Sequence, residues 1–121
     1  MTAPKPWPTE IRLSKDRKSL RVAFDDGQGF DFPAEFLRVE SPSAEVKGHG
    51  PGDRVTVPGK RNVMILAVEP VGNYAVRLTF DDMHNTGIYS WDYFRELAVR
   101  RDKLWSAYLE ALAAKGLSRD S

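Results

Sequence analysis

Residues 63–80 read VMILAVEPVGNYAVRLTF, and this stretch decides the fold class. Residues 63–68 form a nearly continuous apolar run, which is typical of a strand that is buried on both faces. Pro70 and the Gly-Asn pair at 72–73 favour a turn. Across residues 74–80 every second side chain is apolar, which is the period of a strand with one buried face. We therefore predict a β-hairpin whose first strand lies in the centre of its sheet.

Upstream of the hairpin, residues 10–32 repeat this alternation in three short runs. The runs are separated by polar residues at 14–19 and by Asp-Asp-Gly-Gln-Gly at 25–29, where glycine accepts a positive φ at little cost. This pattern predicts a three-stranded antiparallel meander. Pro33 then suits the first turn of a short helix that packs on the sheet.

The remaining elements complete the predicted fold. Turn-forming residues crowd the stretch 41–52, which we expect to be irregular, and a short strand is expected at 88–89. From position 91 to 112 apolar residues recur every three or four positions, which is the spacing of a helix. The charged run at 100–103 is expected to mark a kink or a break in that helix, and Gly116 to end it. The prediction is an α+β fold: small antiparallel β-sheets, an N-terminal meander plus a central hairpin, with a short helix and a C-terminal helix packed on them.

The composition excludes several classes of function. The chain has 121 residues, 41% of them hydrophobic, which fits one domain with a core of its own. It contains no cysteine, and this excludes disulfides, thiolate nucleophiles and cysteine-based metal sites. The 18 basic and 17 acidic residues leave a net charge of +1, which argues against a nucleic-acid partner. No apolar run could span a bilayer and no signal sequence is evident, so we expect a cytoplasmic protein without a membrane partner.

One polar turn carries the first candidate chemistry. Asp81, Asp82 and His84 could bind a divalent metal or move protons. Ordinary turn roles are favoured, because this short spacing lacks further ligands. His49 lies in a glycine-rich loop at 48–52 whose backbone could approach an anion, although a plain loop is the favoured interpretation.

Two serines and two aromatic residues are further candidates. Ser41 and Ser43 could be nucleophiles only beside a base and an oxyanion hole. No G-x-S-x-G motif surrounds them, so we expect them to serve as caps or in turns. Tyr89 and Trp91 follow the His84 turn and are expected at the edge of the core or in the wall of a pocket.

Several stretches together resemble the gamma-butyrobetaine hydroxylase-like N-terminal domain in its stand-alone bacterial form. The resemblance covers roughly residues 8–98, and the helix beyond it is typical of the stand-alone proteins. The stretches are Leu37-Arg38, Ser-Pro-Ser-Ala-Glu-Val at 41–46, Gly-His-Gly-Pro at 48–51, Val-Glu-Pro-Val-Gly-Asn-Tyr at 68–74 and Asp-Asp-Met-His-Asn-Thr-Gly-Ile-Tyr-Ser-Trp at 81–91.

The resemblance implies a structural zinc site that this sequence does not preserve. In the family, zinc is held by three cysteines and one histidine. The corresponding positions here are Ser41, Ser43, Val46 and His84. Two hydroxyls and one imidazole cannot replace three thiolates at a tetrahedral zinc, and valine offers no ligand. We therefore predict that the zinc is absent and that packing and hydrogen bonds hold the loop instead.

The resemblance also bears on activity. In the hydroxylases this domain precedes a separate iron- and 2-oxoglutarate-dependent catalytic domain, and the present chain is too short to hold one. A related domain occurs at the C-terminus of some iron–sulfur carrier ATPases of plastids, which suggests a link to iron–sulfur cluster assembly by association. We predict that the chain is not an enzyme.

The predicted function is a non-catalytic binding or adaptor domain with an unidentified protein partner. The expected surface lies where the loop after residue 38 meets the His84 turn, with polar contacts and an aromatic wall. Its candidate residues are Arg38, Ser41, Ser43, Glu45, His49, Asp82, His84, Tyr89 and Trp91.

Two alternatives remain open from the sequence. The first is a metal-binding protein, either an iron-binding protein linked to iron–sulfur cluster assembly or a weak hydrolase, in which His84 binds the metal with Asp81 and Asp82, with or without His49. The second is weak nucleic-acid binding through the basic C-terminal helix. The predicted organisation is a flexible arm at 1–8, the family domain at 9–99, a helical extension at 100–116 and a frayed tail at 117–121.

Overall fold

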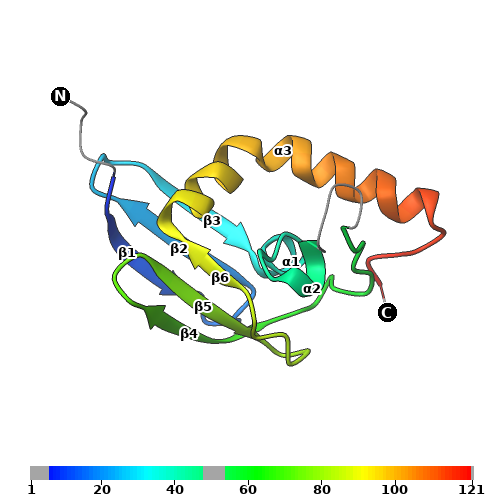
Figure 1. Ribbon diagram of the computed structural model, residues 1–121, viewed down its shortest axis with the longest axis horizontal. Coiled ribbons are helices and arrows are strands. Elements are labelled where there is room, and N and C mark those ends of the chain that lie inside the picture. The colour runs from blue at the N-terminus through cyan, green and yellow to red at the C-terminus, as the bar shows by residue number, and fades with distance from the viewer. Residues whose placement is uncertain (1–5, 48–53, 121) are drawn as a thin grey trace.

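Over residues 6–47 and 54–120, which the computed structural model describes, the chain forms two three-stranded antiparallel sheets (Figure 1). The first sheet has the order β1-β2-β3, with strands β1 (Pro8–Leu13), β2 (Ser19–Phe24) and β3 (Gly29–Pro33). The second has the order β4-β5-β6, with strands β4 (Ile65–Val71), β5 (Ala75–Phe80) and β6 (Ile88–Ser90). The predicted α+β class is confirmed, including the N-terminal meander and the central hairpin.

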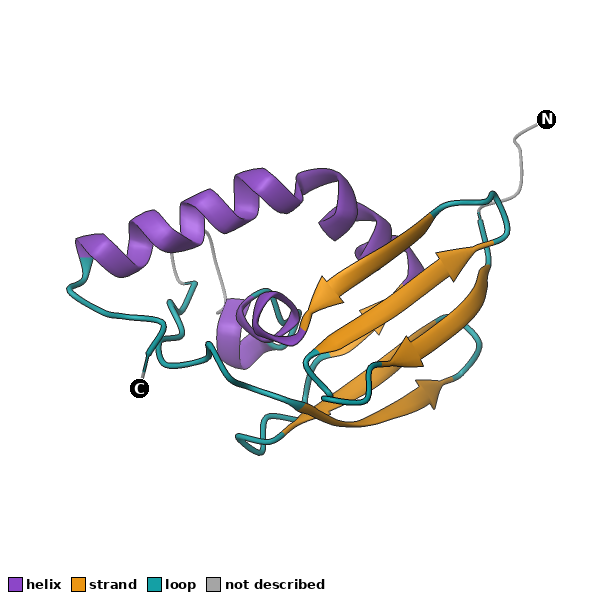
Figure 2. Ribbon diagram, turned by 180° about the vertical axis from the view of Figure 1, so that it is seen from behind, coloured by secondary structure: helices purple, strands orange, loops and turns teal. Residues whose placement is uncertain are grey.

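Three helices complete the described part of the chain. They are α1 (Ala34–Val39), α2 (Ala44–Lys47) and α3 (Trp91–Ala114). Figures 1 and 2 show that α3 begins beside the sheets and extends past them, over the side of the molecule that α1 and α2 occupy. The helices therefore lie mainly at one end of the sheets, and α3 joins that end to the strands.

Both ends of α3 are capped by local hydrogen bonds. At the start, the Ser90 hydroxyl accepts a hydrogen bond of 3.1 Å from the Tyr93 N–H, which satisfies one of the free donors of the first turn. At the end, Gly116 takes a φ of 66°, a left-handed conformation that glycine adopts without a steric penalty. The Leu117 N–H then bonds to the Leu112 carbonyl at 2.9 Å. The predicted stop at Gly116 is confirmed.

The predicted break at residues 100–103 is wrong, because α3 runs through them without interruption. Its basic side chains have partners on the helix surface and on a neighbouring strand. Arg100 pairs with Glu96 one turn earlier, at 3.3 Å, and Arg101 donates to the Asp31 carbonyl of β3 at 2.8 Å. Neighbouring charges therefore support the helix instead of interrupting it.

The main core lies where the two sheets, α1 and the first half of α3 meet. Phe94 of α3 is fully buried and contacts both sheets, with ring centroids 5.6 Å from Phe32 of β3 and 5.7 Å from Tyr89 of β6. Phe36 of α1 stacks on Phe32 from the other side. A second, smaller cluster joins the far half of α3 to the α1–α2 side, and its buried members are Val39, Val46, Val57, Tyr108 and Leu112.

Two predictions about the central segments are wrong. β4 is an edge strand and not the centre of its sheet, because β5 pairs with both β4 and β6. Leu66 of β4 is accordingly 43% exposed, and Pro70 continues β4, as an edge strand allows. The stretch after residue 41 also contains the one-turn helix α2, whose first N–H groups bond to Ser43.

The two ends of the described chain are held by side-chain and backbone contacts. Arg119, which we expected in a frayed tail, forms a two-bond ion pair with the buried Glu35 of α1, at 2.7 and 2.8 Å. Trp7, expected in a flexible arm, forms two hydrogen bonds with Asp25. Its carbonyl accepts from the Asp25 N–H at 2.8 Å, and its own N–H donates to the Asp25 carboxylate at 3.0 Å. Among the described residues, no helix combines the length and the apolar character that crossing a bilayer requires.

Candidate functional site

The loop junction is the place where the segment 41–45, which includes the start of α2, meets the turn 81–87 after β5. Ser41 Oγ lies 2.8 Å from His84 Nε2, and Ser43 Oγ lies 2.6 Å from the Thr86 hydroxyl. In both pairs the partners are 43 residues apart in the sequence. The fold thus brings together the serines and the histidine that the sequence singled out.

The imidazole of His84 is buried and has a partner at each nitrogen. Its Nδ1 lies 3.2 Å from Glu45 Oε2, and its Nε2 faces Ser41. Burial lowers the pKa of His84, and the nearby Arg38 charge lowers it further, against the opposing effect of Glu45 and Asp82. A neutral ring that donates from Nδ1 to Glu45 accepts a hydrogen bond from the Ser41 hydroxyl at Nε2.

Asp82 ties α1 to the turn through three charged or polar contacts. Its Oδ2 accepts from Arg38 Nε at 2.8 Å and from Lys60 Nζ at 2.7 Å, and its Oδ1 accepts from the His84 N–H at 3.1 Å. Burial raises the pKa of Asp82, but the hydrogen bonds from Lys60, His84 and Arg38 outweigh it and lower the pKa to about 2. The carboxylate is therefore charged at neutral pH and neutralised on two sides.

Gly87 allows the two segments to approach each other closely. A Cβ at this position would lie 2.5 Å from Ser41 Oγ and 3.1 Å from the Tyr89 ring, which no side chain could tolerate without a shift. Sequence reasoning did not assign Gly87, Lys60 or Thr86 to the site. A lone glycine just before a predicted strand was the one local signal for Gly87.

Ser41, His84 and Glu45 have the connectivity of a catalytic triad, with the serine on one ring nitrogen and the carboxylate on the other. Ser41 is nevertheless fully buried, and its Oγ also accepts the Ser43 N–H at 3.3 Å. Five of the surface hollows over the described residues have linings that contain neither Ser41 nor His84. The arrangement holds the two loops together.

The two predicted aromatic residues do not form a wall at the loop junction. Tyr89 is buried in the main core, and its hydroxyl donates to the Leu37 carbonyl. Trp91 lies at the other end of β5, where its indole N–H donates to the Asn73 carbonyl at 2.9 Å beside the exposed Tyr74. His49 lies outside the described residues.

The side chains at the implied zinc positions occupy two different environments. Ser41, Ser43 and His84 meet at the loop junction, whereas Val46 is buried in the second apolar cluster against Tyr108 of α3. Asp81 points elsewhere, with one carboxylate oxygen accepting from the Met64 N–H at 3.1 Å. Within residues 6–47 and 54–120, no three histidine, aspartate or glutamate side chains gather as a metal-binding group.

Comparison with known proteins identifies the family. The family model described as gamma-butyrobetaine hydroxylase-like, N-terminal, matches residues 11–95. A solved NMR structure is 50% identical, with a TM-score of 0.80, 95% of this chain covered and 90% of the other chain. A second NMR structure is 47% identical, with a TM-score of 0.80 and coverages of 98% and 91%.

A crystal structure gives a further comparison. It is of a protein of unknown function from Acidithiobacillus ferrooxidans that belongs to the DUF971 family. It is 40% identical, with a TM-score of 0.64, and the match covers 79% of this chain and 97% of that one. No curated protein matches the chain. The family match spans most of the sequence and the two NMR structures match nearly all of it, so the chain belongs to the gamma-butyrobetaine hydroxylase-like N-terminal domain family.

Proposed function

We propose that the chain is a non-catalytic domain that binds a protein partner through the tip of the turn at the loop junction. Met83 carries this proposal. It is 74% exposed and has a φ of 72°, although methionine is strained in the left-handed region by about 1 kcal/mol or more. Asparagine or glycine would suit this backbone better. Strained backbone is typical of functional sites, and exposed methionine side chains are typical of binding surfaces.

The backbone of the turn supports this proposal by fixing where Met83 points. The Phe80 N–H bonds to the His84 carbonyl at 2.9 Å, and the Met83 N–H bonds to the Phe80 carbonyl at the same distance. Asp82 holds the next N–H and is itself held by two cations. The tip is therefore rigid before a partner arrives, which lowers the entropy cost of binding.

We propose that hydrogen bonds take over the structural role of the zinc that the family resemblance implies. The residues present do not fit that metal: two hydroxyls and one imidazole face the junction, and the fourth position is the apolar Val46. Both ring nitrogens of His84 already face partners, Ser41 and Glu45. An iron ion at His84 would have to displace one of them.

The experiment compares two variants that each remove one exposed apolar side chain. Met83→Asn suits the left-handed backbone, and Val99→Gln alters an 86% exposed position on α3. Each protein is immobilised and used to enrich partners from a lysate of the native host, with quantification by mass spectrometry. The partner enriched most strongly is then purified and titrated by calorimetry against all three proteins.

We expect Met83→Asn to weaken that complex by about fivefold or more, as loss of a central apolar contact does, while unfolding stability stays equal or rises. Val99→Gln should bind as the unchanged protein does. Equal affinity of all three proteins would show that the tip of the turn is not the recognition surface. Equal weakening in both variants would lead to the same conclusion.

A further inference from the structure

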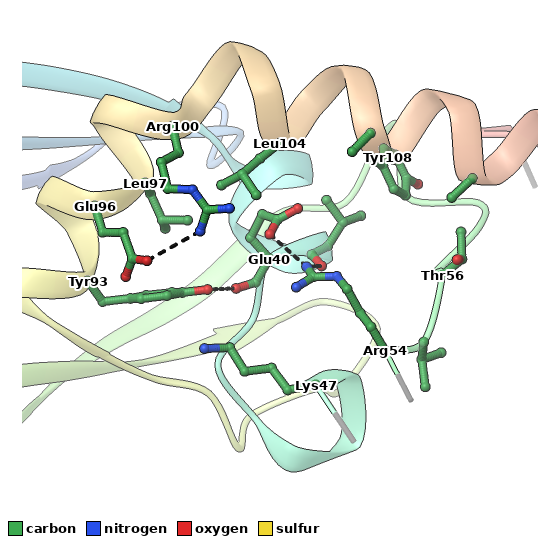
Figure 3. A pocket seen from close by; sticks show the side chains of 14 residues that line it. Glu40, Lys47, Arg54, Thr56, Tyr93, Glu96, Leu97, Arg100, Leu104 and Tyr108 are labelled. Carbon is green, nitrogen blue, oxygen red and sulfur yellow. Dashed lines mark hydrogen bonds and ion pairs between the residues drawn. The ribbon is translucent and has the colours of Figure 1, made fainter. Parts of the chain in front are cut away.

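A hollow of about 330 Å³ lies between α3 and the α1–α2 side of the molecule, and we call it the α3 hollow (Figure 3). Its volume falls at the lower end of the range typical of small-molecule sites. One wall consists of apolar α3 side chains, among them Leu97, Leu104 and Ala107. It shares no residue with the loop junction, so this inference goes beyond the proposed protein-binding function.

The floor of the α3 hollow contains a carboxylate whose charge is already balanced. Glu40 is only 4% exposed, and its Oε1 accepts from Arg54 Nη2 at 2.6 Å. Burial raises the pKa of Glu40, against the opposing charge of Arg54. The Tyr93 hydroxyl donates to the main-chain carbonyl of Glu40, which fixes that part of the wall. Glu40 therefore offers little attraction to an incoming cation.

The rim of the α3 hollow carries an excess of positive charge. Three cations, Lys47, Arg54 and Arg100, and two carboxylates, Glu40 and Glu96, line the hollow (Figure 3). Arg54 is balanced by Glu40, and Arg100 by Glu96 at 3.3 Å. Lys47 Nζ lies 4.6 Å from the centre of the Tyr93 ring and forms no ion pair with a carboxylate of the described residues, although its charge helps to lower the pKa of Glu40.

We propose that the α3 hollow binds a small organic carboxylate with an apolar body. The apolar side chains of α3 suit the body of such a ligand, and the ammonium group of Lys47 suits its single charge. A neutral ligand would form no ion pair with the excess positive charge of the rim. A cationic ligand would meet Lys47 without a free carboxylate to offset the repulsion.

The test uses three probes of the same length and different charge: hexanoate, 1-hexanol and hexylammonium. Each is titrated into the ¹⁵N-labelled chain at pH 7, and amide shifts are followed in two-dimensional NMR spectra. We expect saturable shifts from hexanoate at Val39, Thr56 and Leu104, which line the hollow. We expect binding of 1-hexanol to be at least about threefold weaker, since one partly exposed ion pair contributes up to about 1 kcal/mol, and no saturable shift from hexylammonium.

Two pairs of variants locate the site. Lys47→Gln should weaken hexanoate binding about two- to fivefold, whereas Lys103→Gln, an exposed change outside the lining, should have no effect. Ala107→Leu fills the hollow and should abolish saturation, whereas Ala113→Leu on the same helix should leave it unchanged.

Three results would overturn the proposal. The first is the absence of saturable shifts from hexanoate at the lining residues. The second is binding of 1-hexanol or hexylammonium that is as tight as that of hexanoate. The third is an equal effect of the lining change and its control in either pair of variants. None of these results depends on Met83, so the proposed protein-binding function is tested separately.

Discussion

The hydroxyl of Ser41 serves two groups at once: it faces His84 Nε2 and accepts the Ser43 N–H. All three groups are buried, so removal of the hydroxyl leaves polar atoms without partners and out of reach of water. We predict that Ser41→Ala lowers the free energy of unfolding by about 1–3 kcal/mol. Urea denaturation monitored by tryptophan fluorescence measures this change.

The reactivity of Ser41 distinguishes a structural role of the Ser41, His84 and Glu45 arrangement from a catalytic one. A fluorophosphonate probe should leave the native chain unmodified, because Ser41 is fully buried, while a serine hydrolase in the same tube reacts. Mass spectrometry reads the result. A stoichiometric adduct on Ser41 would mean that the triad-like geometry is catalytic, and the non-catalytic proposal would then be abandoned.

For individual residues of the loop junction, the sequence could indicate which side chains meet but not which contacts hold them in place. Ser41, Ser43 and His84 could be named because they occupy the positions of a known ligand set. Lys60 could not, since its contact with Asp82 depends on how residues 54–63 run between the helices and β4. Trp91 packs at the edge of the core, as one of the two expectations had it, but it does not reach the loop junction because the three residues of β6 carry the chain to the far end of β5.

Among the elements, α3 depends on a cap that the helical pattern alone does not reveal. The Ser90 side chain accepts from the Tyr93 N–H. We predict that Ser90→Ala destabilises the protein by about 1 kcal/mol, as loss of a serine N-cap typically does. Ser106→Ala, an exposed change within the same helix, should instead be neutral or slightly stabilising, because alanine is the better helix former.

If the capping argument holds, thermal or urea unfolding should show a loss of stability for Ser90→Ala and no loss for Ser106→Ala. A loss of similar size in both would mean that serine-to-alanine changes in α3 act through something other than the cap. The comparison is informative because both residues are exchanged for the same side chain.

The elements themselves were largely predictable because alternation and helical spacing are local signals. The hairpin, the meander and α3 each show such a pattern over several residues. The position of a strand within its sheet is not a local property. The apolar run at 63–68 suggested a central strand, but β6 pairs with β5 and leaves β4 at the edge. The helix α2 was missed because one turn, started by Ser43, is too short to show a periodicity.

For the molecule as a whole, the charged groups that link its parts predict a loss of stability in acid. The pKa of Asp82 in the folded chain is about 2, below its ordinary value of 3.8, so its contribution is present above about pH 4 and is lost as the pH falls toward 2. The loss amounts to about 2 kcal/mol. His84 acts in the same direction below its ordinary pKa of 6.5, because its folded pKa is lowered. Glu40 acts in the opposite direction, since its pKa is raised.

The measurement is the free energy of unfolding in urea at a series of pH values between about 2 and 6. Asp82→Asn should be less stable than the unchanged protein at pH 6, because Arg38 and Lys60 lose their counter-charge. It should also lose less stability between about pH 4 and 2, whereas Asp102→Asn, an exposed change on α3, should follow the unchanged protein. If the free energy of unfolding fell equally in all three proteins between about pH 4 and 2, Asp82 would not be the cause of the loss of stability in acid.

The ion pair between Arg119 and Glu35 has a consequence for the order in which a growing chain can fold. Its partners are 84 residues apart, so Glu35 is synthesised long before the guanidinium that neutralises it. At roughly 5–20 residues per second, that interval lasts about 4–17 seconds. During this time the Glu35 carboxylate must stay hydrated, and the face later covered by Trp105 and Arg119 stays open. Synthesis from the N-terminus therefore leaves this face accessible to chaperones until the last turn of α3 and the residues after it have emerged.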